Sequence, residues 1–251
     1  MTARVVAPLA AVAGLLLTLG AGGRVFGWAV VVAAAIALWQ LSEALDATGP
    51  RPILAAAAVA GVGTPLRLVL DRRVGLDVIP TMVAAMLLTA FVLVMVTGRR
   101  HDVARIVAAT AVSGLMVGLG GGGLVLLRSS TAGVRWTLGL LLLVVAPEAV
   151  AVAARRLKTL STTAAEASRF ITAGAVGGGL IAAAGRPLTP LVTAGMVAVS
   201  LGTMYAAALL HRVLLAESAA ADRATSSALR PVVAVLLAGP VVFLLATAVQ
   251  A

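Results

Sequence analysis

Long apolar segments alternate with short polar segments along the whole chain. Nine apolar segments can be drawn, and most of the charged residues lie between them. Most of the segments have the length that a helix needs to cross the hydrocarbon core of a bilayer, about 20 residues. The strands of a transmembrane barrel would instead show short alternating patterns. The nine segments are 5–22, 25–45, 53–70, 78–97, 103–127, 134–154, 170–184, 188–216 and 231–250.

The connections between these segments are short. The longest, 155–169 and 217–230, are expected to be loops, and neither is long enough to fold as a soluble domain. The seventh apolar segment is short and rich in glycine, which indicates either a re-entrant segment or a strongly packed helix. We therefore predict an all-α fold, a polytopic transmembrane bundle of about nine spans, with residues 1–251 forming a single integral membrane domain.

Composition supports the same fold class. Hydrophobic residues make up 61% of the 251 residues and charged residues only 11%, about half the charged fraction of an average soluble domain. A water-soluble globule could not bury this much apolar surface, and a disordered chain would carry far less of it. The chain has no cysteine, which excludes disulfides and thiolate metal sites. The expected location is the plasma membrane, as a multi-pass protein.

The distribution of basic residues predicts the orientation of the bundle. Nine spans place the two termini on opposite sides, and the side of the N-terminus carries the larger number of bases, which puts the N-terminus in the cytoplasm. The net charge of +10 is distributed between apolar segments, so we expect contact with anionic lipid and no binding of nucleic acid. The N-terminal side has the twelve bases Arg4, Arg51, Arg99, Arg100, Arg105, Arg155, Arg156, Lys158, Arg169, Arg212, Arg223 and Arg230; the other side has the seven bases Arg24, Arg67, Arg72, Arg73, Arg128, Arg135 and Arg186.

Glycines recur at a spacing that lets helices approach closely in lipid. Gly114, Gly118 and Gly122 are four residues apart in the fifth segment, and Gly174 and Gly178 repeat that spacing in the seventh. Small residues at this spacing allow helix backbones to touch. These glycine-rich helices are therefore candidate interfaces for a homodimer or for a partner membrane protein.

Glu148 is the most informative acidic residue, because it lies inside the sixth apolar segment, directly after Pro147. An ionised carboxylate in hydrocarbon is costly unless it is paired, hydrated or protonated. Two interpretations remain open. Glu148 is either a metal or proton site in a polar cleft, or an acid near a helix end that is neutralised by Arg155 or Arg156.

Basic residues near the ends of the sixth and eighth segments are candidates for binding phosphate. Arg156 and Lys158 lie in a connection that is rich in hydroxyl side chains, and His211 and Arg212 lie close to the end of the eighth segment. Such groups can hold a phosphate through charge-assisted hydrogen bonds. The alternative is that they anchor the helix ends at the membrane interface, as long basic side chains commonly do.

The order and spacing of the nine segments resemble the CDP-diacylglycerol synthase family, the integral-membrane phosphatidate cytidylyltransferases. The start of the chain, with Arg4, an apolar helix and then GGRVFGWAVVVAAAIALWQLSEAL, is similar to the first two helices of that family. The sixth segment is similar to the family's Asp-Ser/Thr-Gly-Ala-Tyr helix, with Glu148 at the aspartate and Arg156 at a later basic residue. The eighth is similar to the family helix that carries Gly-Asp-Leu-x-Glu-Ser and ends in Lys-Arg, and Gly202 and the pair His211-Arg212 fit its two ends.

The chain departs from the family where the family binds metal. Residues 202–207 read Gly-Thr-Met-Tyr-Ala-Ala, so both acids of that element are replaced. The family also carries a long signature with Lys-Asp and then His-Gly-Gly-x-x-Asp-Arg. In this chain only Asp222 and Arg223 correspond to it, in a shortened connection between two helices. The resemblance therefore implies no catalytic residue, a reduced metal site at Glu148 and Asp222, and a substrate site made of Arg156, Lys158, His211, Arg212 and Arg223.

The function that the resemblance implies is that of a catalytically degenerate cytidylyltransferase, which binds a phospholipid or a membrane partner. No cofactor is implied with certainty. If activity survives, the protein would use Mg²⁺ to transfer CMP from CTP to phosphatidic acid. The alternative from a different class is a small-solute permease, or the membrane subunit of a transport complex.

Overall fold

The computed structural model describes residues 13–46, 52–71, 75–98, 102–156, 162–184, 189–216 and 223–250. Every regular element in these ranges is a helix, which confirms the all-α prediction. A short helical stretch over 13–18 precedes the first long helix. The elements that follow are α2 (Gly23–Asp46), α3 (Leu54–Gly61), α4 (Gly63–Leu70), the 3₁₀ turn η1 (Gly75–Asp77), α5 (Val78–Val96), α6 (Val103–Ser129), α7 (Gly133–Arg156), α8 (Thr162–Ala184), α9 (Pro190–Ala216) and α10 (Arg223–Gln250).

Three helical segments are long and apolar enough to cross a membrane by length and composition, namely Gly23–Glu43, Gly75–Val96 and Val103–Ser129. Five further apolar helices among the described residues are shorter, namely Leu54–Leu70, Gly133–Pro147, Ala167–Ala182, Pro190–Ala206 and Ala234–Val249. These helices support the assignment to membrane proteins. The count of nine spans and the cytoplasmic N-terminus stay predictions.

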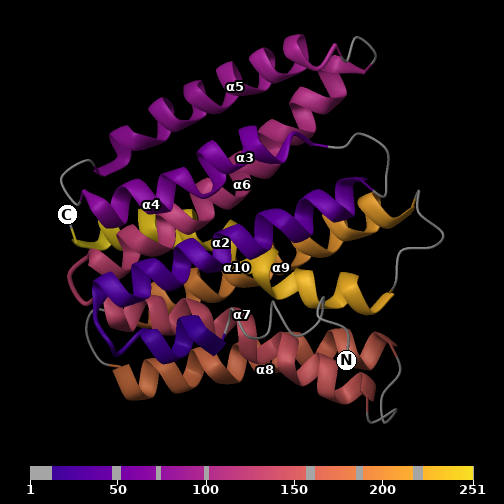
Figure 1. Ribbon diagram of the computed structural model, residues 1–251. Helices are drawn as coiled ribbons and strands as arrows, with labels where there is room; N and C mark the ends of the chain where they lie inside the picture. Colours follow the sequence, from indigo (N-terminus) through magenta and orange to yellow (C-terminus); the bar gives the residue numbers. More distant parts are fainter. Residues whose placement is uncertain are drawn as a thin grey trace.

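The long helices lie side by side with their axes roughly aligned (Figure 1). Helix α6 is the most central helix of the first half of the chain, because it packs against α2, α3, α4, α5, α7 and α10. Helix α10 joins the two halves, since it also packs against α7 and α9. Helices α2, α7 and α9 begin at one end of the bundle, where α4, α6 and α8 finish (Figure 1).

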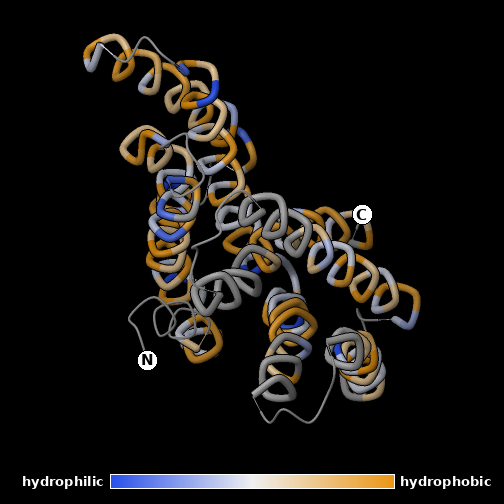
Figure 2. The backbone as a smooth tube through the Cα atoms, turned by 90° about the vertical axis from the view of Figure 1, so that its right-hand side faces the viewer, coloured by the Kyte–Doolittle hydropathy of each residue, from blue (hydrophilic) through white to orange (hydrophobic). Residues whose placement is uncertain are grey.

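Large apolar side chains cover the outside of the bundle as well as its interior. Leu191, Met95 and Ile171 are 84%, 80% and 73% exposed, and they belong to three different helices. Figure 2 shows hydrophobic residues on the outward sides of the outer helices too. Extended apolar surface of this kind indicates contact with a membrane or with another protein.

Glycines in α6 allow close contacts between helices, as their spacing predicted. A Cβ atom on Gly118 would collide with the carbonyl oxygen of Ala60 in α3. A Cβ atom on Gly122 would lie 3.1 Å from the γ-methyl of Thr64 in α4. These contacts lie within one chain. Gly174 and Gly178 of α8 have open space where a Cβ atom would stand, so the homodimer or partner contact stays a prediction.

Two predicted loops are largely helical, and one predicted span is divided. Helix α7 continues to Arg156 and α8 begins at Thr162, so most of 155–169 belongs to helices; similarly, α10 begins at Arg223 inside the connection 217–230. Hydropathy marks where a chain is apolar, whereas alanine-rich polar sequence also forms helix. The segment 53–70 is divided at Val62, between two glycines and before Pro65, which cannot donate a backbone hydrogen bond. The seventh segment, 170–184, lies within the continuous helix α8.

A single hydroxyl joins the start of α3 to α6. The Ile53 amide donates to Oγ1 of Thr110 over 2.9 Å, and this hydroxyl donates over 2.7 Å to the carbonyl oxygen of Ile106. We expect Thr110→Val to lower the free energy of unfolding by about 1–2 kcal/mol, because the partly buried Ile53 amide loses its acceptor. Thr110→Ser keeps the hydroxyl and should keep most of the stability. Thermal unfolding in detergent measures both, and equal losses in the two variants would contradict this role.

Candidate functional site: a basic pocket between α2, α4 and α6

The residues that the sequence predicts to form a site belong to helix ends at one end of the bundle. Arg156 is the last residue of α7, His211 and Arg212 lie in the final turns of α9, and Arg223 is the first residue of α10. Helices α7 and α9 finish, and α10 begins, at the same end (Figure 1). The side chains of these four residues lie outside the described part of the structure. Lys158 and Asp222 lie outside it altogether.

Glu148 lies on α7, and its side chain is also outside the described part. Among the described residues, no group of three or more histidine, cysteine, aspartate or glutamate residues could hold a metal ion. The predicted metal site at Glu148 and Asp222 therefore stays a prediction.

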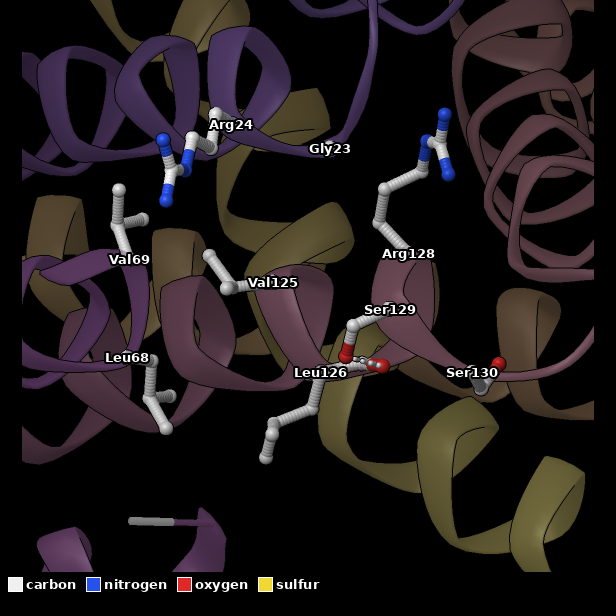
Figure 3. Close-up of a pocket in the computed structure, with 9 residues that line it drawn as sticks. All are labelled: Gly23, Arg24, Leu68, Val69, Val125, Leu126, Arg128, Ser129 and Ser130. Atoms are coloured by element: carbon white, nitrogen blue, oxygen red, sulfur yellow. Dashed lines mark hydrogen bonds between the residues drawn. The ribbon is translucent and has the colours of Figure 1, made fainter. Parts of the chain in front are cut away.

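A different site appears at the opposite end of the bundle. A pocket of about 470 Å³ opens where α2 begins and where α4 and α6 finish. Figure 3 shows the guanidinium groups of Arg24 and Arg128 at two sides of this pocket, with Gly23 between them along the rim. The lining residues are Gly23, Arg24, Leu68, Val69, Val125, Leu126, Arg128, Ser129 and Ser130. Its volume lies within the range of small-molecule sites, about 300–1,000 Å³.

Arg128 is held by its place at the end of α6. Its terminal Nη2 donates to the carbonyl oxygen of Leu19 over 3.2 Å, which connects α6 to the segment before α2. Its Nε is buried and makes no hydrogen bond with the described residues. Arginine presents five N–H donors in a fixed fork that matches carboxylate and phosphate oxygens. Among the described residues only Nη2 has a hydrogen-bond partner, so the other terminal nitrogen, Nη1, remains available to a ligand.

Arg24 and the start of α2 add positive potential to the same pocket. Arg24 is exposed and belongs to the first turn of α2, where the backbone amides have no partner within the helix. The positive end of the helix dipole favours anions at this position. Gly22 has a φ of +106°, a conformation that glycine adopts readily, and the helix begins directly after it.

The rest of the lining is neutral. The hydroxyls of Ser129 and Ser130 donate to the carbonyl oxygens of Leu126 and Leu127 over 2.8 and 2.7 Å, so their lone pairs remain available as acceptors. The nearby Arg67 is engaged by Asp71 at 3.6 Å, and neither residue lines the pocket. With two guanidinium groups and no acid among the described residues that line it, the pocket is suited to an anion. Its apolar wall of Leu68, Val69, Val125 and Leu126 is suited to hydrocarbon.

Sequence reasoning missed this pocket. Arg24 and Arg128 are far apart in the sequence, and each was counted only as a base in a connection. The contact between α2 and α6 brings them together. No local signal predicts that pairing, although both arginines stand beside small residues at helix ends, in GGR and RSS.

Comparisons with protein-family models, with curated proteins and with solved structures found no match to this chain. The fold and the pocket define the class: a helical protein with apolar helices suited to a membrane and a basic pocket at one end of its bundle.

Proposed function

We propose that this chain is a multi-pass integral membrane protein that binds a phospholipid by its anionic headgroup. The observation that carries the proposal is the pocket, where Arg24 and Arg128 stand beside a wall of aliphatic side chains and no acid lines the space. Two guanidinium groups and the start of α2 would hold the phosphate. The wall formed by α4 and α6 would receive the first part of an acyl chain.

The resemblance to phosphatidate cytidylyltransferases leads to the same ligand class by a separate route. In that proposal the protein is a catalytically degenerate relative, in which Glu148 and the bases near the ends of α7 and α9 occupy the place of the family's active site. The basic pocket lies at the other end of the bundle. Lipid binding there does not require any surviving nucleotide chemistry.

Binding of a soluble short-chain phosphatidylglycerol tests the pocket. We expect the variant Arg24→Gln/Arg128→Gln to bind it at least about tenfold more weakly than the unaltered protein, because charge-assisted hydrogen bonds are lost. Arg135→Gln is the matched control, since Arg135 is exposed near the start of α7 but does not line the pocket. Calorimetry in detergent measures the affinity. Equal affinity in the double variant and the control would contradict the proposal, whereas inorganic phosphate bound as tightly as the lipid would exclude a role for the apolar wall.

The orientation of the bundle decides which leaflet supplies the lipid. The excess of bases on the N-terminal side predicts that Arg24 and Arg128 face away from the cytoplasm. The chain has no cysteine, so single cysteines can be introduced without background. In intact cells, a membrane-impermeant maleimide should label Thr131→Cys, beside the pocket end of α6, but should label Asp102→Cys only after lysis. The reverse pattern would place the pocket in the cytoplasmic leaflet.

A further inference from the structure

Three polar side chains are fully buried in the second half of the bundle and make no hydrogen bond with the described protein. They are Trp136 of α7, through its Nε1, and Thr193 and Ser200 of α9, through their hydroxyls. Their exposed fractions are 0%, 1% and 0%. A buried donor without an acceptor is costly, so a folded protein normally provides one.

Other buried hydroxyls in the bundle show how this cost is usually avoided. Thr110, Ser113 and Thr137 each donate to the carbonyl oxygen four residues earlier in the same helix, in every case over 2.7 Å. Thr193 and Ser200 also lie inside a helix, and the same acceptors exist for them. Neither hydroxyl makes that hydrogen bond.

The helix register places Trp136 and Thr193 at the same level. Helices α7 and α9 run in the same direction, and a Cβ atom on Gly139 of α7 would lie 3.1 Å from Cε of Met196 in α9. Trp136 and Thr193 each precede these contact residues by three positions. The γ-methyl of Thr193 would lie 3.9 Å from a Cβ atom on Gly177 of α8. Ser200 lies two turns farther along the same face of α9, about 10 Å from Thr193 along the helix axis.

We propose that α7 and α9 bind ordered water at Trp136 and Thr193. An indole N–H and a hydroxyl at one level provide the two or more polar partners that a buried water requires. A water molecule offers the acceptor that the indole needs, because Trp Nε1 can only donate.

The surroundings favour a neutral ligand over an ion. Leu140, Leu143 and Met196 are all fully buried beside these groups, and an ion in such surroundings would be costly without a counter-charge. The buried guanidinium of Arg169 in α8 has interactions of its own, and Nη2 of Arg128, at the end of α6, donates to the carbonyl oxygen of Leu19. The hydrated site shares no residue with the lining of the pocket between α2, α4 and α6.

The sign of one stability change tests the proposal. Thr193→Val keeps the shape of the side chain and removes the hydroxyl. If water is bound there, the unfolding midpoint in detergent should fall by about 2–4 °C, because the water and the indole both lose a partner. If the hydroxyl is simply unsatisfied in a dry core, the same substitution should raise the midpoint. Thr137→Val is the matched control, and its midpoint should change less than that of Thr193→Val. A midpoint for Thr193→Val that rises or stays equal to that of the unaltered protein overturns the proposal.

A second measurement reads the water directly at the indole. In the background Trp28→Phe/Trp39→Phe, Trp136 is the single tryptophan. We expect its fluorescence lifetime in the folded protein to increase in deuterated solvent, since water in contact with the indole exchanges. Adding Thr193→Val should reduce that increase. A lifetime that is the same in both solvents would show a dry core and would overturn the proposal, whatever the outcome of the lipid-binding experiment.

Discussion

Replacing two glycines of α6 by alanine, in the variant Gly120→Ala/Gly123→Ala, should lower the free energy of unfolding by at least about 3 kcal/mol. A Cβ atom on Gly120 would lie 2.5 Å from the carbonyl oxygen of Leu236, and one on Gly123 would lie 2.7 Å from the backbone nitrogen of Pro240. Both obstacles are backbone atoms of α10, so no side-chain rotation can relieve them. Helices α6 and α10 would have to separate along their contact.

The control for this prediction is a glycine in open space. Gly202 of α9 is exposed, and a Cβ atom there would meet nothing within 4 Å. Gly202→Ala should leave stability unchanged or raise it by up to about 1 kcal/mol, because alanine favours helix more than glycine does. Unfolding in a series of mixed detergent micelles compares the variants. A loss in Gly202→Ala as large as in the double variant would show that helix contacts are not the cause.

Hydropathy predicted most helix positions within a few residues. The segment 103–127 became α6 (Val103–Ser129), and 78–97 became α5 (Val78–Val96). A chain in lipid must satisfy its backbone hydrogen bonds within each segment, so an apolar stretch of this length has few alternatives to a helix. Helix ends in polar sequence were less well predicted. Polarity sets where a helix leaves the membrane, but helix propensity and packing set where it ends.

The glycine pattern predicted close contact but could not predict the neighbour. Gly114 meets α3 and α5, while Gly120 and Gly123 meet α10. The same spacing occurs in α8, but a Cβ atom on Gly174 or Gly178 would meet no described atom within 4 Å. A spacing of small residues indicates only that a helix is able to approach another helix closely. The packing of the whole bundle decides which helix is the neighbour. The same packing places Arg24 and Arg128 in one pocket.

Arg169 shows where the linear pattern was misleading. It was counted as a base in the connection 155–169, yet it lies inside α8 and is only 4% exposed. A Cβ atom on Gly139 of α7 would lie 3.7 Å from Cδ1 of Leu180, and α7 and α8 run in opposite directions. Arg169 precedes Leu180 by eleven residues, so it lies level with the residue eleven positions after Gly139, which is Val150. That level is two residues from Glu148.

We therefore expect Arg169→Met to cost about 3 kcal/mol of unfolding free energy, although methionine fills much of the same space. The guanidinium group is buried and has interactions, and removing it leaves its partners in a low-dielectric interior without their donor. Arg105→Met, at an exposed arginine in the first turn of α6, is the matched control and should change stability by less than about 0.5 kcal/mol. Arg169→Lys keeps the charge but not the planar fork, so its loss should be intermediate. An increase in stability for Arg169→Met would show instead that burial of the charge lowers the stability of the protein. If the stability changes of Arg169→Met and Glu148→Gln do not add in the double variant, Glu148 is the counter-charge of Arg169.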